Sequence, residues 1–229
     1  MEEPDDIYSE ERIREIRLRN SETAIEDFIN RERYIMIKIE NIAQDMELNV
    51  DYIYNLVANS QDEELRNLFI AVRLAKDPKR QNFYETSFYN YMQENRGPNE
   101  FIQLANTGNN AIYLTDQGLV EKVNLQPGMD KTKSLDFYEQ IGNLEYYYYH
   151  KYTEASGGAQ ANQHNDIVHF IRLANNYCQS HDDFINFVSV IDGPYYSTNI
   201  RNEIEVVAGI YLNQRIYVLT WREILQVIN

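Results

Sequence analysis

The 229-residue sequence contains one cysteine, Cys178, which excludes a disulfide within the chain and a zinc site built from cysteines. Long apolar runs are missing as well. No stretch approaches the roughly 20 residues of a membrane-spanning helix, so we expect no membrane association. The first residues, MEEPDDIYSEER, are too charged for a secretory signal peptide, and we therefore expect a cytoplasmic protein.

Basic residues are scarce too. The chain has 21 lysines and arginines against 36 aspartates and glutamates, which gives a formal net charge of −15 at pH 7. Proteins that bind nucleic acids usually carry a basic surface. Net charge governs solubility and non-specific association rather than the chemistry of a site. A DNA-cleaving enzyme of this composition would need a local cationic groove and a divalent metal to offset its carboxylates.

The N-terminal part of the chain is predicted to be helical. Over residues 7–96, long stretches lack proline and glycine and carry apolar residues three and four positions apart. We expect a helical lobe over residues 1–96, whose last helix, 78–95, packs on the core. Residues 42–57 have the pattern of a helix-turn-helix with its second helix beginning at Asp51. We favour two packed helices without a DNA-binding role over a DNA-binding helix-turn-helix, because the second helix carries no lysine or arginine.

The apolar spacing changes to that of β-strands from residue 110. The dipeptide Gly142-Asn143 suits a two-residue hairpin turn. The order of elements predicts an α/β domain over residues 97–229, with a mixed central sheet flanked by helices. Strands are predicted at 111–114, 119–123, 134–141, 144–153, 184–191 and 215–220, and helices at 157–178 and 199–208.

The predicted hairpin brings an acid and a lysine together. If Gly142-Asn143 forms the turn, Asp136 lies opposite Tyr149. Side chains alternate along a strand, so Asp136, Tyr149 and Lys151 project from the same face. A carboxylate and an ammonium group side by side could bind a divalent metal and place a cation next to a scissile phosphate. A cross-strand ion pair on a sheet surface is the alternative.

The residues of this hairpin resemble the restriction-endonuclease-like, or PD-(D/E)XK, family. Lys133-Ser134-Leu135-Asp136-Phe137 followed by Tyr149-His150-Lys151 is similar to the D…(D/E)xK pattern of type II restriction endonucleases, as is the following Gly157-Gly158-Ala159-Gln160. The resemblance covers residues 110–220 in the order of elements. It extends upstream to residues 77–85, which are similar to a helix that many such enzymes place before the sheet.

The resemblance implies a sequence-specific endonuclease that hydrolyses phosphodiester bonds of double-stranded DNA with Mg²⁺. Asp136 and Glu85 would bind the metal, Glu85 because several of these enzymes add an acid from the upstream helix. Lys151 would assist the attacking water and the phosphate. Such enzymes commonly act as homodimers, since a two-fold protein matches a palindromic site.

One position departs from the family pattern. Tyr149 stands where the family has an aspartate or glutamate, and a neutral phenol is a poor metal ligand. Either Glu85 or Glu154 supplies the missing carboxylate, or the site is weak or inactive. Glu145 lies on the same face of the sheet but further along the strand, and is a weaker candidate. A non-catalytic DNA-binding or regulatory protein on the same fold, and a protein-interaction module that uses the helical lobe, are therefore the alternatives.

Polar residues near the predicted site are candidates for DNA contacts. A helix opened by glycines offers backbone amides to phosphate, and amide side chains in its first turns could bond adenine edges or sugar-phosphate oxygens. Basic residues at the start of the upstream helix could contact phosphates. Helix capping and solvation are the alternative. The predicted DNA-binding residues are Lys79, Arg80, Gln160, Asn162, Gln163 and Asn165.

Overall fold

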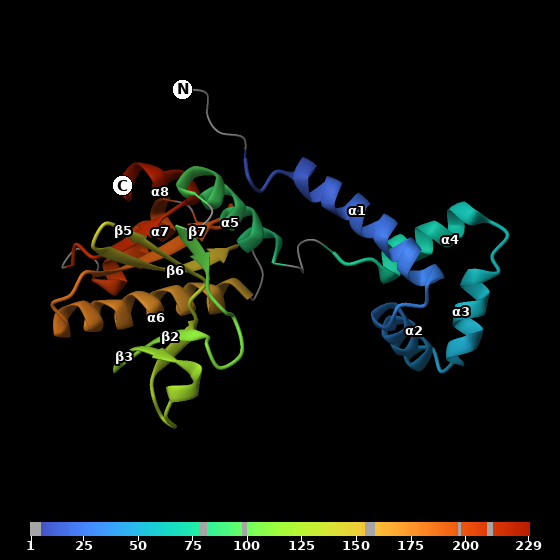
Figure 1. The fold of residues 1–229 in the computed structure, drawn as a ribbon, viewed down its shortest axis with the longest axis horizontal. Coiled ribbons are helices and arrows are strands. Elements are labelled where there is room, and N and C mark those ends of the chain that lie inside the picture. The colour runs from blue at the N-terminus through green and yellow to red at the C-terminus, as the bar shows by residue number, and fades with distance from the viewer. Residues whose placement is uncertain (1–5, 78–81, 98–99, 154–158, 197, 210–212) are drawn as a thin grey trace. The chain divides into compact units, whose positions relative to one another are not determined.

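The computed structural model describes residues 6–77, 82–97, 100–153, 159–196, 198–209 and 213–229 (Figure 1). The chain forms two compact units, Met1–Ser87 and Phe88–Asn229, whose boundary lies inside helix α5 (Phe83–Arg96). Within the described ranges, no helix combines the length and the apolar character that crossing a bilayer requires.

The first unit is helical, as the sequence predicts. Phe28 of its first helix stacks on Tyr54 of its third, with ring centroids 4.9 Å apart, inside an apolar core. Asn49 starts the third helix by accepting hydrogen bonds from the backbone N of Asp51 at 2.8 Å and of Tyr52 at 3.2 Å, which satisfies amide groups that have no partner within a helix. The elements are α1 (Glu10–Ile29), α2 (Arg33–Asp45), α3 (Val50–Ala58), α4 (Glu63–Phe69) and the π-helical turn η1 (Ile70–Leu74).

Helices α2 and α3 are the pair predicted at residues 42–57. The pair is confirmed, and α3 begins at Val50, one residue before the predicted start. Ile39 of α2 and Ile53 of α3 are both buried in the core of this unit. With no lysine or arginine in α3, the contacts agree with the alternative of two packed helices.

The second unit contains a mixed five-stranded sheet, so the predicted α/β class with a mixed sheet and helices is confirmed. Its order is β1-β5-β6-β7-β8, in which β1, β5 and β6 are antiparallel neighbours and β6, β7 and β8 run parallel. The strands are β1 (Phe101–Gln103), β5 (Phe137–Ile141), β6 (Leu144–Tyr152), β7 (Ile185–Asp192) and β8 (Ile216–Leu219). The helices are α6 (Ala159–Ser180), α7 (Thr198–Ala208) and α8 (Trp221–Val227).

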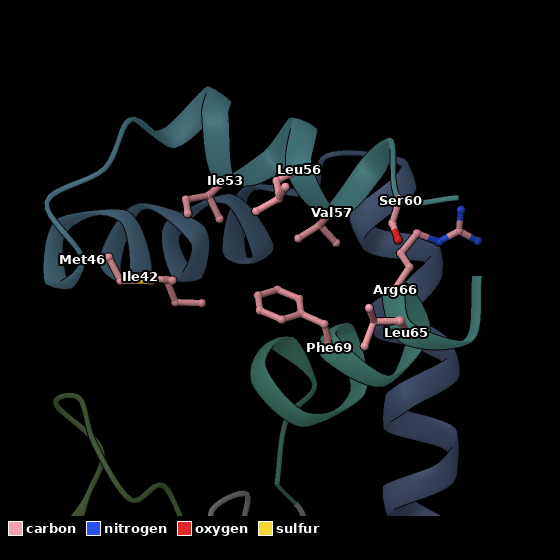
Figure 2. A pocket seen from close by; sticks show the side chains of 9 residues that line it. All are labelled: Ile42, Met46, Ile53, Leu56, Val57, Ser60, Leu65, Arg66 and Phe69. Atoms are coloured by element: carbon pink, nitrogen blue, oxygen red, sulfur yellow. The ribbon is translucent and has the colours of Figure 1, made fainter. Parts of the chain in front are cut away.

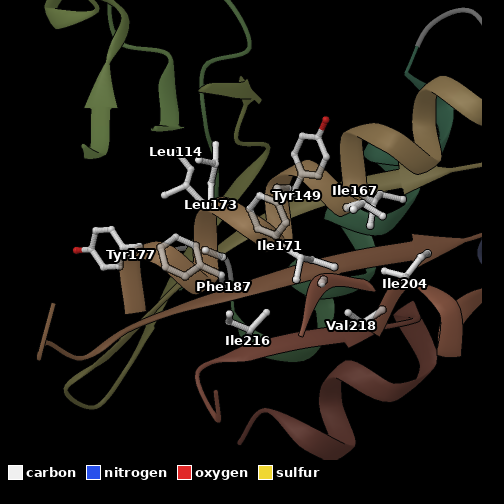
Figure 3. Close-up of a cluster of buried hydrophobic side chains, with 14 of the residues drawn as sticks. Leu114, Tyr149, Ile167, Ile171, Leu173, Tyr177, Phe187, Ile204, Ile216 and Val218 are labelled. Carbon is white, nitrogen blue, oxygen red and sulfur yellow. The ribbon is translucent and has the colours of Figure 1, made fainter. Parts of the chain in front are cut away.

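Aromatic side chains pack on the two faces of this sheet. On one face, Tyr149 stacks on Phe170 of α6, with ring centroids 5.0 Å apart. Figure 3 shows Tyr149 among the apolar side chains of this cluster, with its hydroxyl directed away from them. On the other face, Phe88 of α5 contacts Phe137 and stacks on His150, with centroids 5.3 and 5.0 Å away. The sheet is therefore buried on both sides, as its parallel strands require.

A second, three-stranded sheet was not predicted. Its order is β3-β2-β4, formed by β2 (Ile112–Thr115), β3 (Gly118–Glu121) and β4 (Lys131–Ser134), and β3 is followed by the 3₁₀ turn η3 (Lys122–Asn124). The single strand predicted at 134–141 is wrong, because it is divided between the two sheets. The backbone N of Leu135 bonds Ile112 O at 2.8 Å, whereas that of Asp136 bonds Tyr148 O at 2.9 Å. The chain changes its partner strand between these two residues.

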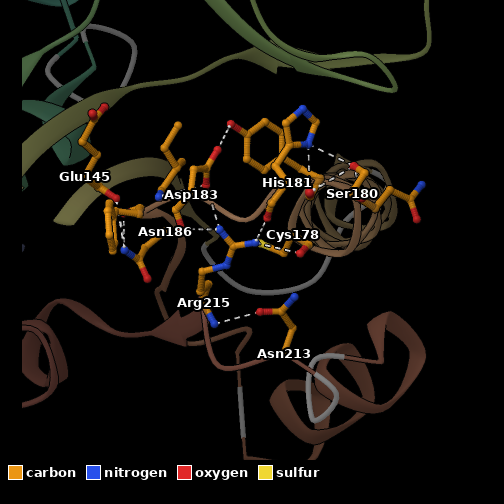
Figure 4. Close-up of polar contacts among 12 residues, drawn as sticks. Glu145, Cys178, Ser180, His181, Asp183, Asn186, Asn213 and Arg215 are labelled. Carbon is orange, nitrogen blue, oxygen red and sulfur yellow. Dashed lines mark hydrogen bonds and ion pairs between the residues drawn. The ribbon is translucent and has the colours of Figure 1, made fainter. Parts of the chain in front are cut away.

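Arg215 forms hydrogen bonds with the C-terminal end of α6 and with the segment before β7 (Figure 4). Its guanidinium group donates to the backbone oxygens of Cys178 at 2.7 Å and His181 at 2.6 Å. It also donates to Asp183 Oδ1 at 2.7 Å, and Asp183 accepts from Tyr177 at 2.6 Å. Burial raises the pKa of Asp183, but the hydrogen bonds and Arg215 outweigh it, so this pKa is below its usual value. One arginine thus satisfies the carbonyl of Cys178 in the last turn of α6 and that of His181 just after it.

Candidate active site at the β5–β6 hairpin

The turn at Gly142-Asn143 forms the predicted hairpin. Gly142 has a φ of 60°, which glycine adopts without steric cost. Phe137 pairs with Tyr148 and Ile141 with Leu144, as the two-residue turn predicts. The register is therefore confirmed, and it sets the faces of all side chains along both strands.

Asp136 and Lys151 lie close together on one face. Lys151 Nζ is 3.7 Å from Asp136 Oδ2 and 4.0 Å from the centroid of the Tyr149 ring. It also donates a hydrogen bond to His150 O at 2.8 Å. The predicted grouping of aspartate, tyrosine and lysine on a shared face is therefore present.

The carboxylate of Asp136 is firmly held but keeps one oxygen available. Its side chain is 7% exposed, and Oδ2 accepts a hydrogen bond from the backbone N of His150 at 2.7 Å. Among the described residues, none donates a hydrogen bond to Oδ1. A buried carboxylate with a fixed orientation and a spare oxygen is suited to binding a cation.

Tyr149 is a neutral phenol in this site. Burial raises its pKa well above the usual value, and the nearby carboxylates of Asp166 and Asp136 raise it further. The hydroxyl therefore stays protonated at neutral pH and does not act as a phenolate ligand. The acid that the family pattern has at this position is not replaced by ionised tyrosine.

Asp166 of α6 is an acid near this site that the sequence interpretation did not single out. Its carboxylate accepts from Lys133 Nζ of β4 at 2.6 Å, and it is close enough to raise the pKa of Tyr149. Asp166 and Phe170 are four residues apart and share one helix face, but only the structure shows that Phe170 packs on Tyr149. A second carboxylate, from a different element, therefore contributes to the electrostatic environment of Tyr149.

Polar side chains also meet where β6 and β7 end. Thr153 donates to Gln163 Oε1, and its hydroxyl lies 3.0 Å from that of Tyr196. Next to them Gly193 has a φ of 101°, and a Cβ there would lie 2.3 Å from Thr153 O. In open α/β sheets, ligands bind outside the carboxyl ends of the strands, which is where these residues lie. The side-chain oxygen of Gln163, a predicted DNA contact, is engaged within the protein.

On the opposite face of the sheet, a buried histidine links three elements. His150 Nε2 is 3.4 Å from Asp192 Oδ2, and Asp192 Oδ1 accepts from the backbone N of Trp221 at 3.0 Å. These residues hold β6, β7 and the start of α8 together behind the Asp136–Lys151 pair.

The remaining predicted site residues are placed as follows. Glu85 lies in the first turn of α5 and belongs to the first unit. Glu145 pairs with Gln140 near the turn, at the far end of the hairpin from Asp136. Glu154, Lys79 and Arg80 fall outside the described residues. Gln160 is half-buried, and Asn162 and Asn165 are exposed on α6.

Few carboxylates of the described residues are available at this site to hold a metal ion. In the described part of the chain, no group of three or more His, Cys, Asp and Glu side chains is placed to hold a metal ion. Mg²⁺ commonly takes one or two protein carboxylates and completes its shell with water and phosphate oxygens. Asp136, with its spare Oδ1, and Asp166 are the candidates.

Comparison with protein-family models, with curated proteins and with solved structures finds no match to this chain.

Proposed function

We propose that this chain is a Mg²⁺-dependent endonuclease of the restriction-endonuclease-like family that cleaves double-stranded DNA at a specific sequence. The observation that carries the proposal is the pairing of Asp136 and Lys151, 3.7 Å apart on one face of the sheet. The hairpin register that produces it is the one that the D…(D/E)xK resemblance calls for. The mixed sheet with helices on both faces is also consistent with the fold that the resemblance implies.

Each residue of the site has a chemical role in this proposal. Asp136 would hold the metal through Oδ1, and Asp166, whose carboxylate together with that of Asp136 raises the pKa of Tyr149, would supply a second carboxylate. When bound, Mg²⁺ supplies Lewis-acid stabilisation of the phosphate and an activated water. Lys151, held by His150 O, would place its positive charge where negative charge develops on the phosphate.

The duplex would approach over α6 and β4 in this proposal. Asn162 and Asn165 present exposed amide groups on α6, which suit adenine edges and sugar-phosphate oxygens. Lys131 is exposed on β4 and would offer a positive charge to a phosphate, whereas Lys133 is paired with Asp166. A homodimer would present two such surfaces to a palindromic site.

A second candidate is a non-catalytic DNA-binding or regulatory protein that keeps the same fold. The observation that favours it is Tyr149, a buried and protonated phenol at the position where the family carries an acid. Such a protein would bind DNA without needing a metal.

Plasmid cleavage tests the proposal. The purified full chain is incubated with plasmids of varied sequence, with Mg²⁺ or with EDTA. We expect discrete fragments that need Mg²⁺, and a loss of at least 100-fold in rate for Asp136→Asn. Asp116→Asn, in an exposed turn, is the matched control and should cut like the wild type. A folded protein that shifts DNA in a gel without metal and leaves it intact would favour the non-catalytic candidate, and one that does neither would refute both.

A further inference from the structure

The helical unit contains an apolar groove between α2, α3 and α4. It has a volume of about 430 Å³, and Figure 2 shows apolar side chains of the three helices turned toward it. This volume is in the range of pockets that take up ligand side chains. The groove is lined by Ile42, Met46, Ile53, Leu56, Val57, Ser60, Leu65, Arg66 and Phe69.

The groove is bordered by large apolar side chains that remain exposed. Met46, Leu56 and Leu65 are 60%, 60% and 59% exposed, although each lines the groove. Every residue of α4 stays at least partly exposed, so the apolar side of this helix is only partly covered within its own unit. Single exposed apolar residues are ordinary, but a contiguous set around a concave surface marks an interaction site.

The charged residues that flank the lining residues in the sequence are mainly acidic. Between residues 42 and 69 the sequence has one basic side chain, Arg66, and this is paired with Glu63 at 3.0 Å. The acidic residues flank the lining residues in sequence, and all are exposed: Asp45, Glu47, Asp51, Asp62, Glu63 and Glu64. An apolar groove whose lining residues are flanked in the sequence by exposed acidic residues, here called the acidic border, is complementary to apolar anchors that are flanked by positive charge.

We propose that this groove binds a basic amphipathic helix of a partner protein. Leucine-like anchors at positions i, i+3 or i+4, and i+7 of such a helix would enter the groove, and lysines or arginines on its flanks would face the acidic border. The site lies wholly within the first unit and does not depend on the nuclease proposal.

A model peptide tests this binding with the full chain. The probe is a fluorescent helix of roughly 18 residues, about five turns, with leucine on one face and lysine on the other. Its partner probe carries glutamate in place of every lysine. We expect saturable binding of the lysine peptide by fluorescence anisotropy, weakened by salt, and at least tenfold weaker binding of the glutamate peptide.

Two matched variants distinguish binding in the groove from non-specific electrostatic attraction to an acidic protein. Leu56→Ser should weaken binding of the lysine peptide at least tenfold. Leu18→Ser, at an equally exposed leucine of α1 that does not line the groove, should bind like the wild type. Equal affinities for both variants would overturn the proposal. So would a homodimer, measured by light scattering, that Leu56→Ser abolishes, because the groove would then be occupied by a second copy of the chain.

Discussion

Lys151 Nζ lies 3.7 Å from Asp136 Oδ2, and the same oxygen accepts a hydrogen bond from the backbone N of His150. The lysine in turn donates to His150 O. Both charged groups therefore form hydrogen bonds with the backbone of one residue of β6. This arrangement makes the pair either the centre of a catalytic site or a buried structural ion pair, and the two roles have different experimental consequences.

Removing the lysine should destabilise the protein, because the Asp136 carboxylate would remain buried without its cation. We expect Lys151→Met to lower the free energy of unfolding by about 2 to 3 kcal/mol. The double variant Asp136→Asn/Lys151→Met should recover part of this loss. Urea unfolding of both single variants and the double variant gives the coupling energy. Strictly additive effects would show that the two charges do not stabilise each other.

Introducing the family's acid should create metal affinity. Tyr149→Glu places a carboxylate close to Asp136 and Asp166, at the cost of the ring contact with Phe170. We expect a less stable protein whose melting temperature rises with Mg²⁺ more than that of the wild type, since a ligand that binds the folded state stabilises it. Tyr149→Gln, which loses the same ring, is the control. If Mg²⁺ raises the melting temperatures of the two variants equally, residue 149 is not part of a metal site.

The acid sensitivity of the protein should depend on Glu223. Burial raises its pKa, but the hydrogen bond from Thr220 N at 2.7 Å and the contacts of Arg201 at 2.7 and 2.9 Å outweigh this, so its pKa lies below the usual value. A carboxylate whose pKa is lowered by folding stabilises the protein above its unfolded-state pKa, and this contribution is lost as the pH falls.

Glu223→Gln should therefore be less stable than the wild type at neutral pH, and the difference should shrink below about pH 4.5, through the range in which the folded-state carboxyl takes up a proton. Urea unfolding at a series of pH values measures the difference. Glu203→Gln, at an exposed position of α7, should differ little from the wild type at every pH. A Glu223→Gln deficit that does not change with pH would contradict the prediction.

Gly193 should tolerate no side chain. Its φ of 101° is unfavourable for other residues, and a Cβ would lie 2.3 Å from Thr153 O. We expect Gly193→Ala to cost about 3 kcal/mol of unfolding free energy. Gly128 also has a positive φ, of 87°, but open space around its Cβ position, so Gly128→Ala should cost only about 1 kcal/mol. Similar losses at the two positions would mean that the backbone at Gly193 shifts to relieve the contact.

The sequence alone was sufficient for features that depend on neighbouring residues. The helical character of residues 7–96 follows from apolar spacing and the lack of helix breakers, and the hairpin register follows from the turn at Gly142-Asn143. Once that register is set, the shared face of Asp136 and Lys151 follows from the alternation of side chains. The predicted α/β class rests on the same local signals.

Only the tertiary structure decided which strands pair with which. Leu135 and Asp136 are adjacent in the sequence, yet they bond to different strands in different sheets, and no local pattern distinguishes them. The short strand β1 forms its backbone hydrogen bonds with β5, which is distant in the sequence. Likewise, α6, which carries Asp166, packs on the sheet at Tyr149. Backbone hydrogen bonds between distant segments carry no signature in local periodicity. Which strands form these hydrogen bonds is decided by the burial of the apolar faces of sheets and helices, which is a property of the folded chain.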